Sequence, residues 1–541
     1  MKGIPNAVGK QKAIVESPLY GKPRLIMGIA GSGKSVTVLN RVIRIKNQAP
    51  NDRILVITYN KSLRDHFQAQ LEQEFGSSIT ITVNNYDSYI YNCLKNMTLI
   101  YNNYYEDYYC NNSTELLNPI SLEIRKANKV NKLKAAWDKY RTINKHKTKD
   151  LNDVFNFSSS RIFFLSDLTR NFGSILRNTI AKNPNNRGYY RKDLQNFYIF
   201  FIRLIQREGL YTFDLFKDCV TKEFNNCLDV VDEIYSVYKE YLLYIESAGY
   251  YWDLDELLNA FSFMINELGL KGYNHILLDE AQDMSDTLVK SLNNLLLPNG
   301  SLLLFGDESQ QIYENLTKDL VDVLEFSESP TILDENYRNK KEVALYMKAI
   351  QEMEPFPKNP FYKDIAIPTT SSEKPHHFEF STTLKTQDPD IELKFLYEKI
   401  IIEGVKDSSI GIILKDWTYL RRVETFLDNQ GFLNYIILND NSNIVDYENK
   451  VVLTTMHSSK GLEFDYVLIP FQGLQDQYSY VRSQSDLVQE IILFYVSCSR
   501  AVNSLVLTYS NPARLLISTL DSTLYNKTVI DKEWTTQENN S

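Results

Sequence analysis

The stretch "GIAGSGKS" (residues 28–35) combines three glycines with a lysine and a serine in the spacing of a phosphate-binding loop. The apolar run "RLIM" (24–27) comes before it and is typical of a buried strand. The segment "SVTVLNRVIRIK" (35–46) carries apolar residues at helical spacing. Because a strand, a glycine-rich turn and a helix follow one another in this order, the sequence predicts a nucleotide site rather than a simple turn.

The residues of this loop have separate expected tasks. Glycines let the backbone curl so that its N–H groups point at phosphates. Lys34 is expected to reach the β- and γ-phosphates, and Ser35 is expected to hold Mg²⁺ at the helix N-terminus. The candidate phosphate-binding residues are Gly28, Gly31, Ser32, Gly33, Lys34 and Ser35.

A second part of such a site is a strand that ends in carboxylates. The stretch "HILLDEAQD" (275–283) is an apolar run followed by Asp279 and Glu280. Asp279 suits Mg²⁺ coordination, usually through a water, and Glu280 can take the proton from an attacking water. Acidic pairs at strand ends are often only helix caps. Together with a strong phosphate loop, however, this pair favours catalysis.

Composition narrows the class of protein. A chain of 541 residues is too long for one hydrophobic core and indicates several domains. Its 43% hydrophobic and 23% charged residues are ordinary for a soluble globular protein. The absence of a long apolar run argues against a membrane span, and the first residues lack the apolar core of a signal peptide. Five scattered cysteines without a CxxC pair favour a reducing cytoplasm over a zinc site or a disulfide framework.

Eight further stretches resemble, in chain order, the motifs of the UvrD/Rep group of superfamily 1 helicases. One such match is moderate evidence, whereas eight in the right order are a specific signal. They are "GKQKAIV" (9–15), "ILVITYNKSL" (54–63), "ITVNNYDSYIY" (81–91), "YWDLDELLNAF" (251–261), "LLLFGDESQQIY" (302–313), "LDENYRNKKEV" (333–343), "VVLTTMHSSKGLEFDYVLIP" (451–470) and "FYVSCSRA" (494–501).

The resemblance implies ATP with Mg²⁺ and suggests roles for residues around the base and sugar. Gln11 stands where the family has its adenine-reading glutamine. Tyr337 would stack on the adenine ring, and Glu463 would meet the ribose. These three residues complete the expected nucleotide-binding set.

The resemblance also implies three residues near the γ-phosphate. Gln310 would sense this phosphate and pass its state to the DNA groove. Arg338 and Arg500 lie far from the loop in sequence, as expected if a second domain closes over the nucleotide. Their guanidinium groups would then stabilise charge on the transferring phosphate, supplied by the same chain.

Four candidate nucleic-acid-binding residues come from the same motifs: Tyr59, Asn60, Tyr86 and His457. Every base offers a face on which an aromatic ring can stack. A tyrosine in a strand is as often part of the core, so both interpretations of Tyr59 and Tyr86 stay open. The expected partner is single-stranded or 3′-tailed DNA, and the resemblance implies movement in the 3′ to 5′ direction.

The sequence departs from the family pattern in three places. After "QQIY" (310–313) it reads "ENLTKD" (314–319) where the family has Gly-Trp-Arg-Gly, so a DNA-stacking tryptophan is absent. The segment 411–437 resembles the one before the family's 2B subdomain, yet the motif with His457 begins about fifteen residues later, which leaves no room for 2B. The insert at 91–248 is long for a 1B subdomain.

The insert contains a basic run. Residues 121–150 carry ten Lys or Arg and three Asp or Glu, although the whole chain has a net charge of −9. An isolated charge run is usually a solvated helix face. In a helicase-like chain it becomes a candidate phosphate-contacting face, since helical spacing is plausible over 122–141 and again over 229–247.

The expected fold is α/β, with two RecA-like parallel sheets facing across a nucleotide cleft and a mainly helical insert in the first. Residues 1–90 and 249–330 form the ATP-binding domain 1A, and 91–248 form the helical 1B insert. Residues 331–525 form domain 2A, and the polar stretch 526–541 is a C-terminal tail.

Two functions are consistent with these motifs. The first is an ATP-dependent single-stranded DNA translocase or helicase that works in DNA repair or replication. The second is a nucleic-acid-activated ATPase that regulates a partner nuclease in anti-phage defence, because the compact form resembles the UvrD-like subunit of Gabija-type systems. Unwinding by the chain alone would favour the first, and stable association with a nuclease effector would favour the second. Neither requires a membrane, and both are expected in the cytoplasm.

Replacement of Lys34 is the simplest test of the nucleotide site. The change Lys34→Ala removes the ammonium group that is expected to reach the phosphates, so hydrolysis of ATP should be abolished. Steady-state release of phosphate measures this directly. Retained turnover would remove the loop from the active site.

Overall fold

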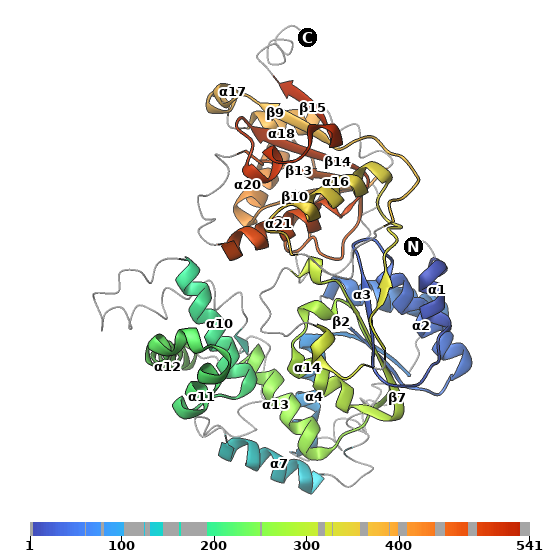
Figure 1. Cartoon of the computed structure of the whole chain (residues 1–541), viewed down its shortest axis with the longest axis vertical. Coiled ribbons are helices and arrows are strands. Elements are labelled where there is room, and N and C mark those ends of the chain that lie inside the picture. Colours follow the sequence, from blue (N-terminus) through green and yellow to red (C-terminus); the bar gives the residue numbers. More distant parts are fainter. Residues whose placement is uncertain are drawn as a thin grey trace.

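The chain forms two α/β domains and a helical insert, as seen in a computed structural model (Figure 1). The second domain lies above the first in this view, and the green helices of the insert lie to the left of the first domain. The structure describes residues 4–59, 61–76, 80–101, 124, 130–143, 162–163, 192–248, 252–311, 320–326, 328–357, 366–388, 390–398, 408–438, 450–473 and 484–530.

The first domain is built on a parallel sheet. In the described part of the chain six strands form it, in the order β3-β2-β6-β7-β1-β8. Short apolar runs such as "ILVIT" at β2 are buried along their whole length, as expected for strands covered on both faces. The strands are β1 (Arg24–Gly28), β2 (Ile54–Thr58), β3 (Ile81–Asn85), β6 (Tyr273–Leu278), β7 (Leu296–Gly306) and β8 (Thr331–Leu333).

Helices cover both faces of this sheet because side chains alternate along each strand. On β1, Leu25 and Met27 belong to one core, whereas Ile26 belongs to the core on the other face. The Ile26 face packs against α1 (Gly9–Glu16), α2 (Lys34–Gln48) and α3 (Lys61–Phe75). The opposite face packs against α4 (Tyr86–Tyr101), α13 (Leu254–Leu268), α14 (Asp286–Asn294) and α15 (Leu320–Val323), with α7 (Val130–Ile143) outside them.

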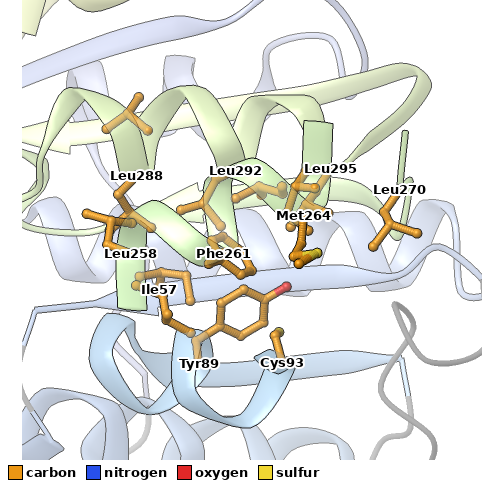
Figure 2. Packing of buried hydrophobic residues seen from close by; sticks show 14 of the residues in the cluster. Ile57, Tyr89, Cys93, Leu258, Phe261, Met264, Leu270, Leu288, Leu292 and Leu295 are labelled. Carbon is orange, nitrogen blue, oxygen red and sulfur yellow. The ribbon is translucent and has the colours of Figure 1, made fainter. Parts of the chain in front are cut away.

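Figure 2 shows how α4 joins this second layer. Tyr89 and Cys93 lie on the side of α4 that faces α13, where Phe261 meets the Tyr89 ring edge-on with centroids 6.0 Å apart. Leu288 and Leu292 of α14 complete the layer. Helix α4, where the insert begins, and helix α13, which follows its end, are therefore packed in one core.

The insert has a core of its own. Its aromatic and aliphatic side chains come from α10 (Lys192–Glu208), α11 (Phe213–Glu223), η3 (Asn225–Val230) and α12 (Val231–Ser247). Two short strands, β4 (Ile162–Phe163) and β5 (Trp252–Asp253), pair in parallel. The helix expected over 229–247 is confirmed by α12. In the stretch 122–141, Ile124 is helical and α7 runs from Val130 to Ile143.

The second domain repeats the plan with a larger sheet. Its described strands run in the order β11-β12-β10-β13-β14-β9-β15, with every pairing parallel. They are β9 (His376–Phe380), β10 (Ile410–Leu414), β11 (Tyr435–Ile437), β12 (Val451–Thr455), β13 (Phe464–Ile469), β14 (Ala501–Ser510) and β15 (Asn526–Ile530). Helices α16 (Lys341–Glu352), α21 (Gln484–Cys498) and α22 (Leu515–Ser518) cover one face, and α17 (Thr382–Gln387), α18 (Ile391–Leu396) and α20 (Trp417–Asn429) cover the other.

The fold class is confirmed, but three of the predicted boundaries differ from the structure. Helix α4 continues across the limit set at residues 90 and 91. Strand β8 was assigned to the second domain, yet it pairs with β1 and completes the first sheet. The predicted tail begins with β15, whose backbone pairs with β9 and whose Ile530 is buried. Polar composition hid β15 because only one face of an edge strand is covered.

The connection between β11 and β12 bears on the missing subdomain. These strands pair in parallel, and only thirteen residues (438–450) separate them. Within the described ranges, no helix has the length and apolar character needed to cross a membrane.

The core of Figure 2 predicts a large stability effect. Phe261 is fully buried, so Phe261→Ala should lower the free energy of unfolding of the first domain by about 3–5 kcal/mol. Urea unfolding followed by circular dichroism measures this change. The control Leu243→Ala changes a side chain that is 57% exposed and should shift stability by less than about 0.5 kcal/mol. Equal shifts for both variants would contradict the packing.

Candidate active site between the two domains

The candidate catalytic residues of the first domain follow the carboxyl ends of three strands. The phosphate loop follows β1, Asp279 and Glu280 follow β6, and Asp307 follows β7. Since these strands neighbour one another in parallel, segments hundreds of residues apart meet at one edge of the sheet. This edge faces the second domain.

Two glycines of the loop have left-handed backbone conformations that only glycine adopts readily. Gly31 has φ 75° and Gly33 has φ 76°. A Cβ atom at Gly33 would lie 2.3 Å from Gln11 Nε2, and one at Gly31 would lie 2.4 Å from Asn336 Oδ1. The side chains of Gln11 and Asn336 therefore pack directly against the loop backbone. Among the described residues, the buried Ser32 Oγ has no hydrogen-bond partner, which fits a cradle for phosphate oxygens.

Lys34 points back into the loop. Its Nζ donates to Gly28 O at 2.7 Å and to Ile29 O at 3.3 Å, and it lies 3.9 Å from Asp307 Oδ2. An ammonium group held only by carbonyls and one distant carboxylate can exchange these contacts for phosphate oxygens. The residues present therefore fit the phosphates of a nucleotide.

Ser35 and Asp279 meet as a metal site requires. Ser35 Oγ donates to Asp279 Oδ2 at 2.8 Å. Burial raises the pKa of the Asp279 carboxyl to about 6, and the neighbouring Glu280 charge adds to the rise. A buried carboxylate beside a hydroxyl, both hard oxygen donors, fits Mg²⁺. The bound ion would supply charge stabilisation for the phosphates.

Glu280 is held in a strained conformation. Its φ is 56°, which is costly for a residue with a Cβ and is typical of functional sites. Gln282 Nε2 donates to Glu280 Oε2 at 2.6 Å, and Lys460 Nζ lies 3.8 Å from the same oxygen. Burial alone would raise the pKa of Glu280, but the charges of Lys460 and Lys34 outweigh it and lower the pKa to about 2. Glu280 therefore remains an ionised base.

The residues expected around adenine lie beside the loop. Gln11 Nε2 donates to Ser32 O at 2.8 Å, and Gln11 Oε1 accepts from Val8 N at 3.2 Å. Tyr337 N donates to Gly31 O at 2.8 Å, while its ring is 46% exposed. An exposed ring next to the loop is available to a base, and contact of either residue with adenine stays a prediction.

The second domain contributes arginines from two directions. Arg500 is buried, and its Nη2 donates to Gln310 Oε1 of the first domain at 3.0 Å. Burial lowers the pKa of Arg500 to about 9, with a further lowering by Arg338, so the group stays protonated at neutral pH. Arg338 Nε donates to Glu463 Oε1 at 2.7 Å. Arg338 and the predicted ribose residue are thus partners of each other here.

Sequence reasoning missed the residues that tie this cluster together. Lys460 Nζ contacts Asp283 Oδ2 and donates to Gln310 O at 2.8 Å. Asp307 Oδ2 accepts from Gln310 Nε2 at 2.5 Å. Burial raises the pKa of Asp283 to about 7 although Lys460 opposes this. All three missed residues (Lys460, Asp283 and Asp307) lie inside quoted motifs, which was the signal that could have found them.

The candidate nucleic-acid residues are only partly brought together. Tyr59 directly follows β2 and Tyr86 directly follows β3 in the chain. Their ring centroids lie 5.5 Å apart. His457 is exposed on the second domain, after β12. Asn60 lies outside the described residues. The tyrosine pair stands at the same sheet edge as the phosphate loop, which is compatible with either interpretation of these rings.

Most of the basic run at 121–150 lies outside the described residues. Within α7, Leu133 and Trp137 are buried, whereas Lys132 and Lys139 are exposed. Lys139 Nζ pairs with Glu267 at 2.6 Å. A solvated helix face and a phosphate-contacting face both remain predictions.

Comparison with known protein families identifies the family to which the chain belongs. Residues 8–330 match the UvrD/REP helicase N-terminal domain, and residues 420–512 match the UvrD-like helicase C-terminal domain. The chain belongs to the UvrD/REP helicase family. The family consists of ATP-dependent DNA helicases, in agreement with the cluster between the two sheets.

Individual relatives are more distant. A segment of 160 residues is 27% identical to DNA helicase II of Escherichia coli (strain K12), and it covers 28% of this chain and 21% of that protein. The C-terminal domain of a possible DNA helicase from Lactobacillus plantarum WCFS1 is 17% identical and covers 35% of this chain and 98% of that one, with a TM-score of 0.25. The family assignment rests on the domain matches alone.

The buried contact of Lys460 with the first domain generates a prediction. Lys460→Ala leaves the Asp283 carboxyl without its cation and should reduce ATP turnover by at least about tenfold, because the domains lose a buried contact. The control Lys10→Ala removes an exposed Lys–Asp pair, to Asp334, and should change turnover by less than about twofold. Phosphate release compares the variants. Similar turnover in both would contradict a role for Lys460.

Proposed function

We propose that this chain hydrolyses ATP between its two α/β domains and uses the resulting closure to move along single-stranded DNA in the 3′ to 5′ direction. Family membership supports DNA helicase activity in general. One observation supports hydrolysis between the domains: a buried arginine of the second domain, Arg500, donates to Gln310 at the edge of the candidate nucleotide site. The 3′ to 5′ direction comes from the resemblance of the motifs alone.

Each step of hydrolysis has a candidate group. Lys34 neutralises the β- and γ-phosphates, and Ser35 with Asp279 holds Mg²⁺. Glu280 accepts the proton of the attacking water. Arg500 and Arg338 stabilise the charge that develops on the transferring phosphoryl group. The charges of Lys460 and Lys34 keep the Glu280 carboxylate ionised, which a proton acceptor requires.

The contacts of Arg338 support a closing motion. Its partner Glu463 is about half exposed, and exposed ion pairs contribute only about 0–1 kcal/mol. Arg338 can therefore leave Glu463 for a phosphate at little cost, while Glu463 turns to the ribose. The segment that joins the domains contacts both of them. Tyr337 N donates to Gly31 O of the first domain at 2.8 Å, and Asn339 Nδ2 donates to Ser499 O of the second domain at 3.1 Å. The intervening residues thus connect the phosphate loop to the segment that carries Arg500.

A second candidate function is favoured by the short link between β11 and β12. Thirteen residues leave no space for an inserted subdomain that would contact duplex DNA. A motor without that part can act as a nucleic-acid-activated ATPase that regulates a partner, such as a nuclease in anti-phage defence. Unwinding assays separate this function from an autonomous helicase.

The decisive experiment measures ATP turnover and unwinding on one preparation of the full chain. With single-stranded DNA, turnover should rise, and a 3′-tailed duplex should be unwound whereas a 5′-tailed duplex should not. Arg500→Lys keeps the charge but loses the planar fork, so turnover should fall about 1,000-fold while nucleotide binding persists.

The matched control is Arg53→Lys, at the opposite end of β2. It should keep turnover near the wild-type level. DNA-stimulated turnover without unwinding would favour the regulatory function. Normal turnover in Arg500→Lys would remove Arg500 from the site.

A further inference from the structure

Trp417 is a large aromatic residue left exposed on the second domain. It is the first residue of α20 and is 42% exposed, although tryptophan is highly buried on average. The guanidinium of Arg421 lies over its ring at 5.7 Å. Such a pair supports the helix modestly. It does not explain why the rest of the indole faces solvent.

The helix end itself is already satisfied. Asp416 caps α20, and its Oδ1 accepts from Thr418 N at 2.8 Å and from Tyr419 N at 3.3 Å. A ligand at this place would therefore meet the indole ring and nearby side chains rather than the backbone amides of the helix.

Trp417 stands on the edge of the sheet that leads to the nucleotide site. Leu414 ends β10 and pairs with Thr455, which ends β12, and Met456 N donates to Leu414 O at 2.8 Å. The chain then continues to His457, exposed at the same edge, and to Lys460, which contacts the first domain. The loop of Lys460 and the start of α20 are thus joined by a backbone hydrogen bond.

Arg421 lies over the ring, and Lys415 comes two residues before Trp417 in the chain. Lys415 and Arg421 are both solvent-accessible, and their acidic partners are Glu490 at 3.4 Å and Glu424 at 2.6 Å. The Arg421–Glu424 pair is the more exposed of the two, and pairs of that kind contribute little and exchange partners readily, whereas Glu490 is largely buried and also pairs with Arg514. An exposed aromatic face flanked by cations is the chemistry that binds single-stranded nucleic acid, since bases stack and phosphates pair.

We propose that Trp417 is a base-stacking residue for single-stranded DNA on the second domain, with Lys415 and Arg421 as the cations that meet the adjacent phosphates. The inference rests on the proposed function and adds a contact site to it. A duplex hides the faces of its bases, so the site selects single strands. Trp417 and the loop of Lys460 follow the ends of two neighbouring parallel strands. The contact of Trp417 with a base therefore changes as the cleft closes.

The test uses the full chain and a fluorescent 20-residue oligo(dT). Trp417→Ala should weaken binding about tenfold, as expected for the loss of one stacked base. Trp417→Phe keeps an aromatic ring and should stay within about threefold of wild type. The control Leu433→Ala changes a residue that is 83% exposed elsewhere on the same domain and should bind normally. Basal ATP turnover without DNA should be unchanged in every variant, which excludes misfolding.

A second readout follows the indole itself. Oligo(dT) should quench part of the intrinsic tryptophan fluorescence of the wild type, and this part should vanish in Trp417→Phe although that variant still binds. Blunt duplex should bind equally to wild type and Trp417→Ala. Wild-type affinity and quenching in both Trp417 variants would overturn the stacking site while leaving the proposed function intact. A wild type that neither binds oligo(dT) nor responds to it in turnover would overturn both.

Discussion

Two buried cations of the second domain, Lys460 and Arg500, take part of their polar partners from the first domain. Removing such groups from water costs several kcal/mol unless polar atoms replace the water. Lys460 meets Asp283 and the backbone carbonyl of Gln310, and Arg500 meets the side-chain oxygen of Gln310. The positions of the two sheets are therefore tied to η5 (Glu308–Gln310), the short helical turn after β7.

Gln310 also connects this contact to the phosphate loop. Its Nε2 donates to Asp307, and Asp307 lies 3.9 Å from Lys34. Lys34, Asp307, Gln310 and Arg500 therefore form a continuous series of polar neighbours. Binding at the loop and the arrangement of the domains share one chain of polar contacts.

Buried and exposed charged groups between the two domains differ in how costly their contacts are to break. The buried contacts of Lys460 and Arg500 are expensive to break and hold the domains in register. The pair of Arg338 and Glu463 is partly exposed, at 18% and 51%, and is less costly to rearrange than these buried contacts. Trp417 is exposed at the same end of the second sheet as the Lys460 loop, on the surface proposed to contact DNA.

Local sequence patterns predicted much of the fold and of the nucleotide site. The strand before "GIAGSGKS", the helix after it and the strand before Asp279 all form as expected, because each depends on neighbours a few residues away. The structure differs from the predicted boundaries at β8 and β15 because their strand partners, β1 and β9, lie 150 residues or more away in sequence.

The sequence by itself predicted which residues gather at the ends of the strands, since motif order places them after the strands of two parallel sheets. Only the tertiary structure decided that Lys460 is buried against Asp283, that Glu280 is strained and ionised, and that Trp417 stays exposed. Burial and charge pairing depend on which distant segments pack together, and that information is absent from any local pattern of residues.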